Sequence, residues 1–335
     1  MNLFAPPPDP TDSAADPVVS GGAISREKLA SLLSFREPAI ALVSTETGPR
    51  DGFVFERLEF EVEGAGRVRA LLTRPARADG PCPAILYGHS HGGRREIGAS
   101  ELMDGRSYLL SPFGPLLAGA GYVTLCMDMP TFGARSQTEE SAAAKAHIWY
   151  GTSLIGQMVS EQAAALTYLR SRDDVDPQRI GAFGISLGST LAYWHAALDL
   201  RIRAIAHLCC YADYATLVEL GAHDNHGIYL LVPGMLRHTS TGEIAGMVAP
   251  RPQLICLGED DELTPPLSIE RALAVTRPMY EQAGAPEALE VFVQAGVDHR
   301  ETPQMHEKVM AFFQRELRPD STTDPGERGA GRPKT

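Results

Sequence analysis

Short apolar segments alternate with longer amphipathic segments over most of the chain. The apolar segments are rich in aliphatic and β-branched residues, as is typical of strands buried on both faces, and they cover residues 84–88, 122–127, 179–185, 204–210, 253–257 and 289–293. The amphipathic segments predict helices over residues 108–120, 157–172, 187–198, 267–283 and 303–317. This alternation predicts an α/β fold, with a mostly parallel central sheet and helices on both of its faces.

An antiparallel hairpin is expected in front of the parallel strands. Residues 53–62 and 67–74 both have an extended pattern, and the turn signal E-G-A-G occupies residues 63–66 between them. A short helix over residues 25–36 should precede the hairpin, because Ser25 is a good N-cap and Glu27 lies in the first turn. The N-terminal part of the sheet is therefore expected to be antiparallel.

Composition predicts one domain with a tail at each end. Residues 1–22 are rich in proline, alanine and aspartate and are expected to be disordered, and residues 319–335 are expected to form a flexible tail. Residues 23–318 should form a single domain. Within it, residues 211–248 have no clear strand, which predicts a short insertion near the site instead of a second domain.

Charge and cysteine usage narrow the possible partners. The net charge of −12 argues against nucleic acid or an anionic membrane surface as a main partner. No apolar run reaches the ~18 residues of a membrane-spanning helix. The five cysteines lack metal-ligand spacing and the first residues lack a secretory pattern, so buried, reduced thiols and a cytoplasmic location are expected. Whether the chain forms a homo-oligomer stays open.

The strongest chemical signal is the pattern G-I-S-L-G at residues 184–188. It follows a predicted strand and precedes a predicted helix, which is the context that a G-x-S-x-G nucleophile elbow requires. Ser186 then stands on a strained turn, and the N-terminal amides of the next helix point toward its hydroxyl. Glycine is expected at 184 and 188 because a Cβ there would collide with the neighbouring strand or helix. Ser186 is the predicted nucleophile.

Two loops near the end of the chain supply the expected base and its carboxylate. In folds built around this elbow, the chain order is serine, acid, histidine. The predicted strand 253–257 ends in an acidic loop with Asp260 and Asp261, and His299 follows the predicted strand 289–293. We expect His299 to take the proton of the nucleophile and Asp261 to orient the imidazole. Asp260 is the rival carboxylate.

A Gly/His-rich loop, H-S-H-G-G at residues 89–93, follows the strand 84–88. With D-M-P-T-F-G-A-R-S at 128–136, the elbow, A-P-R-P at 249–252, the Asp261 loop and His299, it resembles the dienelactone-hydrolase-like branch of the α/β-hydrolases, which includes acetyl xylan esterases. The resemblance spans about residues 65–317 and implies an oxyanion hole made by the amides of Leu187 and His91. Ser90 departs from the pattern, because relatives commonly have glycine there. Serine would strain the loop if that position has a positive φ.

These features predict a serine hydrolase that cleaves a carboxylic ester of a small acyl group, such as an acetyl ester, through an acyl-enzyme. No cofactor is expected, and no metal, because His89 and His91 lack a nearby acidic partner in the sequence. His226 and Tyr229 in the insertion are candidates for the substrate pocket. Two alternatives stay open: a peptidase or thioesterase with the same triad, and a non-catalytic binding protein on this fold.

Overall fold

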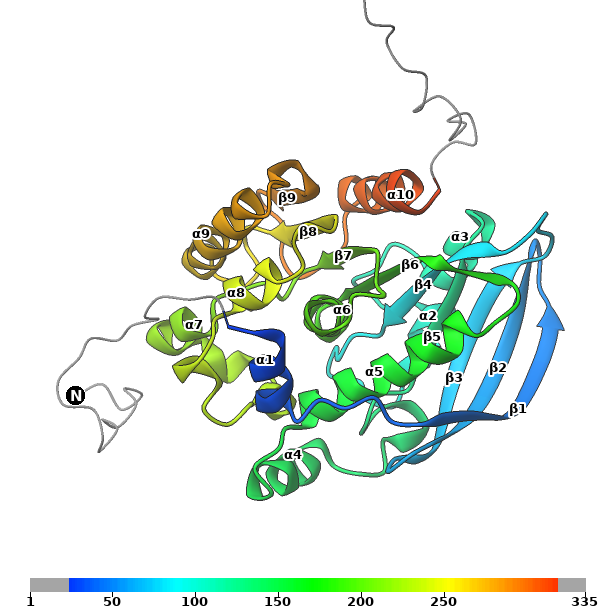
Figure 1. Cartoon of the computed structure of the whole chain (residues 1–335), viewed down its shortest axis with the longest axis horizontal. Helices are drawn as coiled ribbons and strands as arrows, with labels where there is room; N and C mark the ends of the chain where they lie inside the picture. Colours follow the sequence, from blue (N-terminus) through cyan, green and yellow to red (C-terminus); the bar gives the residue numbers. More distant parts are fainter. Residues whose placement is uncertain (1–23, 319–335) are drawn as a thin grey trace, which may run out of the picture.

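The computed structural model describes residues 24–318, so the two predicted tails lie outside the described residues. Nine strands of this part form one sheet in the order β1-β2-β3-β5-β4-β6-β7-β8-β9 (Figure 1). The strands are β1 (Ile40–Pro49), β2 (Phe53–Val62), β3 (Gly66–Pro75), β4 (Cys82–Gly88), β5 (Val123–Met127), β6 (Val175–Ile185), β7 (Ala204–Leu208), β8 (Gln253–Gly258) and β9 (Leu289–Gln294).

The sheet changes from antiparallel to parallel at β5. Strands β1, β2 and β3 pair in antiparallel fashion, and β3 also runs antiparallel to β5. Every neighbouring pair from β5 across to β9 is parallel. The predicted α/β fold, with its N-terminal hairpin and mostly parallel sheet, is confirmed.

Helices cover both faces of the sheet and enclose two hydrophobic cores. Side chains alternate along β4, so Ala84 and Leu86 join one core whereas Ile85 and Tyr87 join the other. The first core receives residues of α1 (Arg26–Leu33), α5 (Leu154–Arg170), α6 (Leu187–Leu198), α8 (Thr241–Gly246) and α9 (Pro266–Gln282). The second core receives residues of α2 (Glu101–Asp104), α3 (Phe113–Gly119) and α10 (Pro303–Leu317).

Strand β1 and helix α4 (Glu140–Trp149) are among the elements that were not predicted. Strand β1 lies at the edge of the sheet with most of its residues exposed, so it lacks the alternation of a half-buried strand. Helix α4 buries only Ala144, so it has no apolar stripe to identify it. Two predicted boundaries also differ from the structure. The helix predicted over residues 108–120 begins only at Phe113, after Pro112. The strand predicted over residues 204–210 ends at Leu208, because the next two residues have positive φ.

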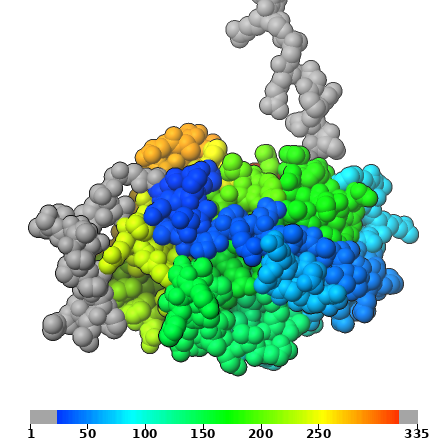
Figure 2. Space-filling model, turned by 60° about the horizontal axis from the view of Figure 1, so that its bottom comes forward, coloured from blue at the N-terminus to red at the C-terminus, as the bar shows by residue number. Residues whose placement is uncertain are grey.

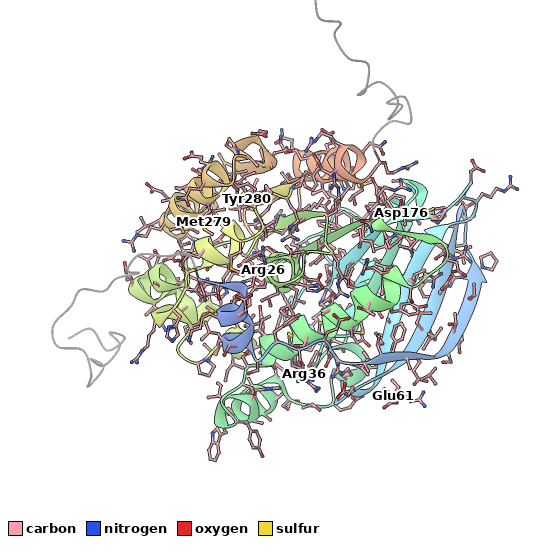
Figure 3. The ribbon with its side chains drawn as sticks, in the orientation of Figure 1. Arg26, Arg36, Glu61, Asp176, Met279 and Tyr280 are labelled. Atoms are coloured by element: carbon pink, nitrogen blue, oxygen red, sulfur yellow. The ribbon has the colours of Figure 1, made fainter. Side chains whose placement is uncertain are left out.

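The segment 211–248 forms no strand and packs around the end of the sheet. Besides α8, it contains helix α7 (Tyr214–Leu220) and the 3-10 turns η3 (Ala222–Asn225), η4 (Ile228–Leu230) and η5 (Met235–Arg237). The guanidinium of Arg26 on α1 (Figure 3) donates to the carbonyl of Met247 in this segment at 3.0 Å and to the carbonyl of Ala197 on α6 at 2.8 Å. In the space-filling view, the blue N-terminal elements lie across the surface between the yellow-green insertion and the cyan and green strands and helices (Figure 2).

The cysteines confirm one expectation from the sequence, because all five are free thiols and all are buried. Burial raises the pKa of each of these thiols. Among residues 24–318, we find no helix that combines the length and the hydropathy needed to cross a bilayer.

Three glycines allow β4, β6 and α6 to approach each other closely. A Cβ on Gly188 would lie 1.9 Å from the carbonyl oxygen of Gly88, and a Cβ on Gly184 would lie 2.5 Å from the carbonyl carbon of Gly188. These positions have no room for a side chain, as expected from the elbow motif.

Substitution Gly188→Ala should lower the free energy of unfolding by at least ~2 kcal/mol, because two backbones must separate to admit the methyl group. Urea denaturation of the purified protein measures this change. Gly119→Ala is the matched control, because nothing lies within 4 Å of a Cβ at that helical position and its φ is not positive. Equal stability of both variants would contradict the prediction.

Candidate active site

Ser186 lies between β6 and α6 in a strained backbone conformation. Its φ of 59° and ψ of −120° are unusual for a residue with a side chain, and such conformations cost ~1–3 kcal/mol. Its amide donates to the Leu208 carbonyl at 3.0 Å, and its carbonyl accepts the first turn of α6 from Thr190 at 3.2 Å. The strand and helix therefore hold the serine in the elbow geometry that the motif predicted.

Asp261 and His299 are brought together by the loops after β8 and β9. His299 Nδ1 donates to Asp261 Oδ2 at 2.7 Å, and the other carboxylate oxygen accepts from the Leu263 amide at 2.9 Å. Asp261 is buried, with 1 % of its surface exposed, whereas Asp260 is exposed. The imidazole is thus paired with Asp261 and not with its rival.

Two consecutive cysteines connect this pair with Ser186. Cys210 Sγ lies 3.8 Å from Ser186 Oγ. The Sγ of Cys209 lies within 4.8 Å of ligand atoms of both Asp261 and His299. No hydrogen bond joins Ser186 to His299 in the described part of the chain, but the adjacent cysteines place the two side chains in the same region. The hydrogen bond between a nucleophile and its base commonly becomes short only when a substrate binds.

One group of side chains near Ser186 could be considered as a metal site. Within residues 24–318, Cys209, Asp261 and His299 form the group whose donor atoms are close enough for an ion. The His299 Nδ1–Asp261 pair is already closed by a hydrogen bond, and burial raises the pKa of the Cys209 thiol well above its usual value. A protonated thiol is a poor ligand, so this group fits an ion badly.

His89 of the 89–93 loop also has both of its nitrogens engaged. Its Nδ1 donates to the Ser90 carbonyl at 3.0 Å, and its Nε2 accepts from the Met129 amide at 3.1 Å. Burial lowers the pKa of His89, so the ring is neutral. It connects the 89–93 loop with the 128–136 loop.

The predicted oxyanion loop is supported by a buried carboxylate that the sequence did not reveal. Glu101 accepts from the Ser90 amide at 3.0 Å, the Ser90 hydroxyl, the Tyr87 hydroxyl at 2.8 Å and Arg106 Nε at 2.8 Å. Arg106 also donates to the carbonyls of Ser90 and His91, both at 3.2 Å. Neither Glu101 nor Arg106 belongs to a motif, and only the folded chain brings them under the loop.

Ser90 occupies the expected glycine position without left-handed strain. Its φ is not positive, whereas Gly92 and Gly93 have φ of 55° and 67°. The serine hydroxyl binds both Glu101 and the Tyr108 hydroxyl. The Tyr108 ring lies 6.4 Å from the His299 ring, and the Glu301 amide donates to the Tyr108 carbonyl at 2.9 Å. Tyr108 therefore connects the 89–93 loop with the histidine loop.

The amides of Leu187 and His91 remain available as donors. Neither donates a hydrogen bond to another group of residues 24–318. The His91 side chain is held by Glu140 of α4, whose Oε2 lies 2.7 Å from His91 Nε2, and by the Gly93 amide, which donates to Nδ1 at 3.1 Å. The unpredicted helix α4 thus orients a residue of the predicted oxyanion loop.

The two candidate pocket residues lie beside these loops. The Tyr229 ring stacks on His91 with centroids 5.4 Å apart, and His226 Nε2 donates to the Leu263 carbonyl at 2.9 Å. Burial lowers the pKa of His226 and raises that of Tyr229. The insertion therefore contacts the loops that carry His91 and Asp261, and a substrate-binding role for its residues stays a prediction.

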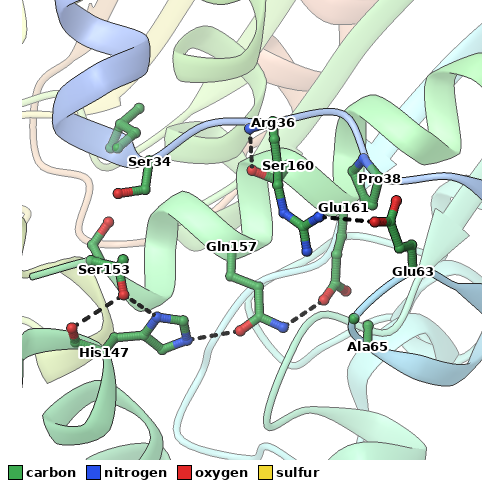
Figure 4. A pocket seen from close by; sticks show the side chains of 13 residues that line it. Ser34, Arg36, Pro38, Glu63, Ala65, His147, Ser153, Gln157, Ser160 and Glu161 are labelled. Carbon is green, nitrogen blue, oxygen red and sulfur yellow. Dashed lines mark hydrogen bonds and ion pairs between the residues drawn. The ribbon is translucent and has the colours of Figure 1, made fainter. Parts of the chain in front are cut away.

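Two cavities lie outside the group of Ser186, Asp261 and His299. One, of about 400 Å³, lies between α5 and the link from α1 to β1, and its wall carries a chain of hydrogen bonds from His147 through Gln157 to Glu161, each 2.8 Å long (Figure 4). The other, of about 530 Å³, borders the 89–93 loop and is lined by Gly92, Arg106 and Tyr108 among others.

The chain is similar in sequence to a known protein family and to a protein with a hydrolase name. The sequence model of the dienelactone hydrolase family matches residues 112–213. YtaP of Bacillus subtilis (strain 168), which carries a hydrolase name without a stated substrate, is 36% identical over 269 residues, covering 80% of this chain and 90% of YtaP.

Solved structures extend the likeness to most of the chain. A Bacteroides fragilis protein, provisionally described as an acetyl xylan esterase, superposes with a TM-score of 0.66 at 19% identity and covers 87% of this chain and 86% of its own. Acetyl xylan esterase 1 from Thermoanaerobacterium gives a TM-score of 0.62 at 16% identity, covering 87% of this chain and 92% of its own. At these identities the superpositions show a shared fold. The resemblance expected from the sequence is confirmed.

Substitution Glu101→Gln should lower the free energy of unfolding by about 3 kcal/mol, because it leaves the buried Arg106 guanidinium without its carboxylate. Thermal and urea denaturation measure the loss. The control is Glu96→Gln, which breaks an exposed pair with Arg94 and should leave stability unchanged. Two variants of equal stability would show that the buried pair does not support the loop.

Proposed function

Because the chain belongs to the dienelactone hydrolase family of carboxylic-ester hydrolases, we propose that it cleaves esters of small acyl groups, acetyl esters included, with Ser186, His299 and Asp261 as a catalytic triad. The observation that supports this most is the 2.7 Å hydrogen bond between His299 and the buried Asp261, in the same region as the strained Ser186 elbow. The substrate is a small-molecule ester, and no cofactor takes part.

The hydrogen bond to Asp261 sets the role of each imidazole nitrogen. His299 Nδ1 carries a proton because it donates to Asp261 Oδ2. Nε2 is then the unprotonated nitrogen, and it takes the proton of Ser186 as the hydroxyl attacks the ester carbonyl. The ionised Asp261 stabilises the imidazolium that forms.

The two free amides stabilise the charge that develops on the carbonyl oxygen. The Leu187 amide lies at the positive end of the α6 dipole, and we assign the second donor to the His91 amide in the loop after β4. Two such donors lower the energy of the transition state, in which the carbonyl oxygen becomes negatively charged. The loss of one donor typically lowers the rate ~10²–10³-fold. His299 then returns its proton to the leaving alcohol, and water cleaves the acyl-serine by the same route in reverse.

The environment of the thiols supports the expected cytoplasmic location. All five cysteines are unpaired and buried, and unpaired thiols are typical of proteins kept in a reducing compartment. We therefore propose a cytoplasmic enzyme that acts on a small-molecule ester.

Substitution Ser186→Ala should lower kcat for p-nitrophenyl acetate at least ~10³-fold, because no acyl-enzyme forms without the hydroxyl. Stopped-flow absorbance should also show a burst of p-nitrophenol in the native protein that disappears in the variant. Ser171→Ala, at an exposed helix C-cap, is the matched control and should retain full activity. A burst that persists in Ser186→Ala would assign the chemistry to another residue.

Substitution Asp261→Asn should reduce kcat/KM about 10³–10⁴-fold with little change in KM, because an amide holds the imidazole in the wrong tautomer. Asp260→Asn tests the rival carboxylate one residue earlier and should leave kcat/KM within about twofold. Steady-state kinetics on the same ester give both values. The opposite ranking would transfer the role of Asp261 to Asp260.

A further inference from the structure

The two residues that follow β7 form a strained turn, which we call the cysteine turn. Cys209 and Cys210 have φ of 60° and 49°, a left-handed conformation that is unfavourable for residues with a Cβ atom. Such conformations persist only where the surrounding structure holds them, and they are frequent at active sites. The cysteine turn therefore needs other groups to hold it.

The cysteine turn places two consecutive thiols at the proposed site. Cys210 Sγ lies 3.8 Å from Ser186 Oγ. The Sγ of Cys209 lies within 4.8 Å of ligand atoms of both Asp261 and His299. The turn therefore borders both the nucleophile and its proposed base, and a shift of the turn would change both of these distances.

Main-chain hydrogen bonds fix the entry to the cysteine turn, and a side chain fixes the next carbonyl. The Ser186 amide donates to the Leu208 carbonyl at 3.0 Å, and the Cys209 amide donates to the Cys256 carbonyl at 2.8 Å. The Cys209 carbonyl accepts from Ser189 Oγ at 2.7 Å. Because Ser189 lies in the first turn of α6, this bond joins the cysteine turn to the helix that begins at the elbow.

Ser189 is the last of three buried side chains that are hydrogen-bonded in a row. We call Gln253 on β8, His207 on β7 and Ser189 the polar chain. Gln253 Nε2 lies 3.1 Å from His207 Nε2, and His207 Nδ1 lies 3.2 Å from Ser189 Oγ. An amide nitrogen can only donate, so the imidazole accepts at Nε2 and carries its proton at Nδ1. Nδ1 then donates to Ser189, whose single hydroxyl proton is left for the Cys209 carbonyl.

Burial keeps the protons of the polar chain in this order. All three of its side chains have no exposed surface, and burial lowers the pKa of His207 to about 3. The imidazole is therefore neutral at the pH of an ester assay, and the Gln253 amide selects one of its two tautomers. The Ser189 hydroxyl is thus directed at the Cys209 carbonyl and not at the imidazole.

We propose that the polar chain positions the cysteine turn, and through it aligns Ser186 with His299 for proton transfer. Without its donor, the Cys209 carbonyl would turn away and the strained backbone would relax, which would move the thiol beside Ser186 Oγ. Reacting groups are sensitive to such shifts, because a displacement of ~1 Å can lower a rate ~10²-fold. This inference rests on the proposed function. It adds Ser189, His207 and Gln253 as positioning residues, since they act through the cysteine turn.

A fluorophosphonate probe separates alignment from folding, because Ser186 Oγ displaces its fluoride once per molecule. The labelled fraction at completion counts the folded, competent protein, and the second-order rate constant measures the attack. Ser189→Ala should lower this rate constant at least ~10-fold while labelling still goes to completion, because the Cys209 carbonyl loses its donor. The kcat/KM for p-nitrophenyl acetate should fall by the same factor.

His207→Leu tests the same chain one link earlier. Without the imidazole, the Ser189 hydroxyl is free to bond a carbonyl of its own helix, as serines in helices commonly do. The labelling rate constant should then fall at least ~3-fold. If Ser189→Ala fails to fold, His207→Leu decides the matter with the same readout.

Thr73→Val is the matched control, because it also removes a buried hydroxyl that donates to a carbonyl. Thr73 Oγ1 donates to the Gly114 carbonyl at 3.0 Å, and its strand β3 is separated from β6 by β5 and β4. Thermal denaturation should show a lower Tm for both Thr73→Val and Ser189→Ala, since each loses a buried hydrogen bond. The labelling rate constant of Thr73→Val should stay within about twofold of the native value.

The outcomes distinguish this inference from the function on which it rests. A native rate constant in Ser189→Ala, or a smaller labelled fraction with an unchanged rate constant, would show that the polar chain only stabilises the fold and would overturn the inference. An equal loss of rate in Thr73→Val would overturn it too. If the native protein is not labelled at Ser186, the proposed function fails and takes the inference with it.

Discussion

The backbones of β4 and α6 meet at Gly88 and Gly188, and this contact determines where the other parts of the site can lie. A Cβ on Gly188 would lie 1.9 Å from the Gly88 carbonyl oxygen, so the two elements approach as closely as two main chains can. The approach turns the chain sharply at Ser186, with φ of 59°, and it places the loop after β4 beside the first amide of α6. The proposed nucleophile and the proposed oxyanion donors therefore depend on one steric constraint between glycines.

Around this contact, each loop is held by a partner that lies outside the loop itself. Glu101 and Arg106 hold the loop after β4, Glu140 holds His91, and Asp261 holds His299. Tyr108 joins the first of these loops to the last through its hydroxyl and its carbonyl. Most of these polar groups are buried and paired, which restricts the loops to one arrangement.

Sequence patterns predicted the parts of this structure that depend on local or periodic signals. Strands such as β4 and β8 are buried throughout and almost entirely apolar, and the elbow is a contiguous motif, so both could be recognised. The edge strand β1 and helix α4 escaped because neither buries an apolar face of its own. Glu101 and Glu140 escaped for another reason: their partners are set by tertiary packing, and no spacing in the chain encodes it. Chain order led to the acidic loop after β8, and the choice of Asp261 over Asp260 within that loop agrees with the observed hydrogen bond.

The central claim is that Ser186 attacks while the amides of Leu187 and His91 bind the developing oxyanion. A crystal structure of the protein after reaction with p-nitrophenyl methylphosphonate tests it most directly, because the phosphonyl group copies the tetrahedral intermediate. The account predicts phosphorus bonded to Ser186 Oγ, a phosphonyl oxygen about 2.7–3.1 Å from both amides, and His299 Nε2 facing the side of the leaving group. Phosphorus on Cys210 or another residue, or an oxygen bound by neither amide, would contradict it.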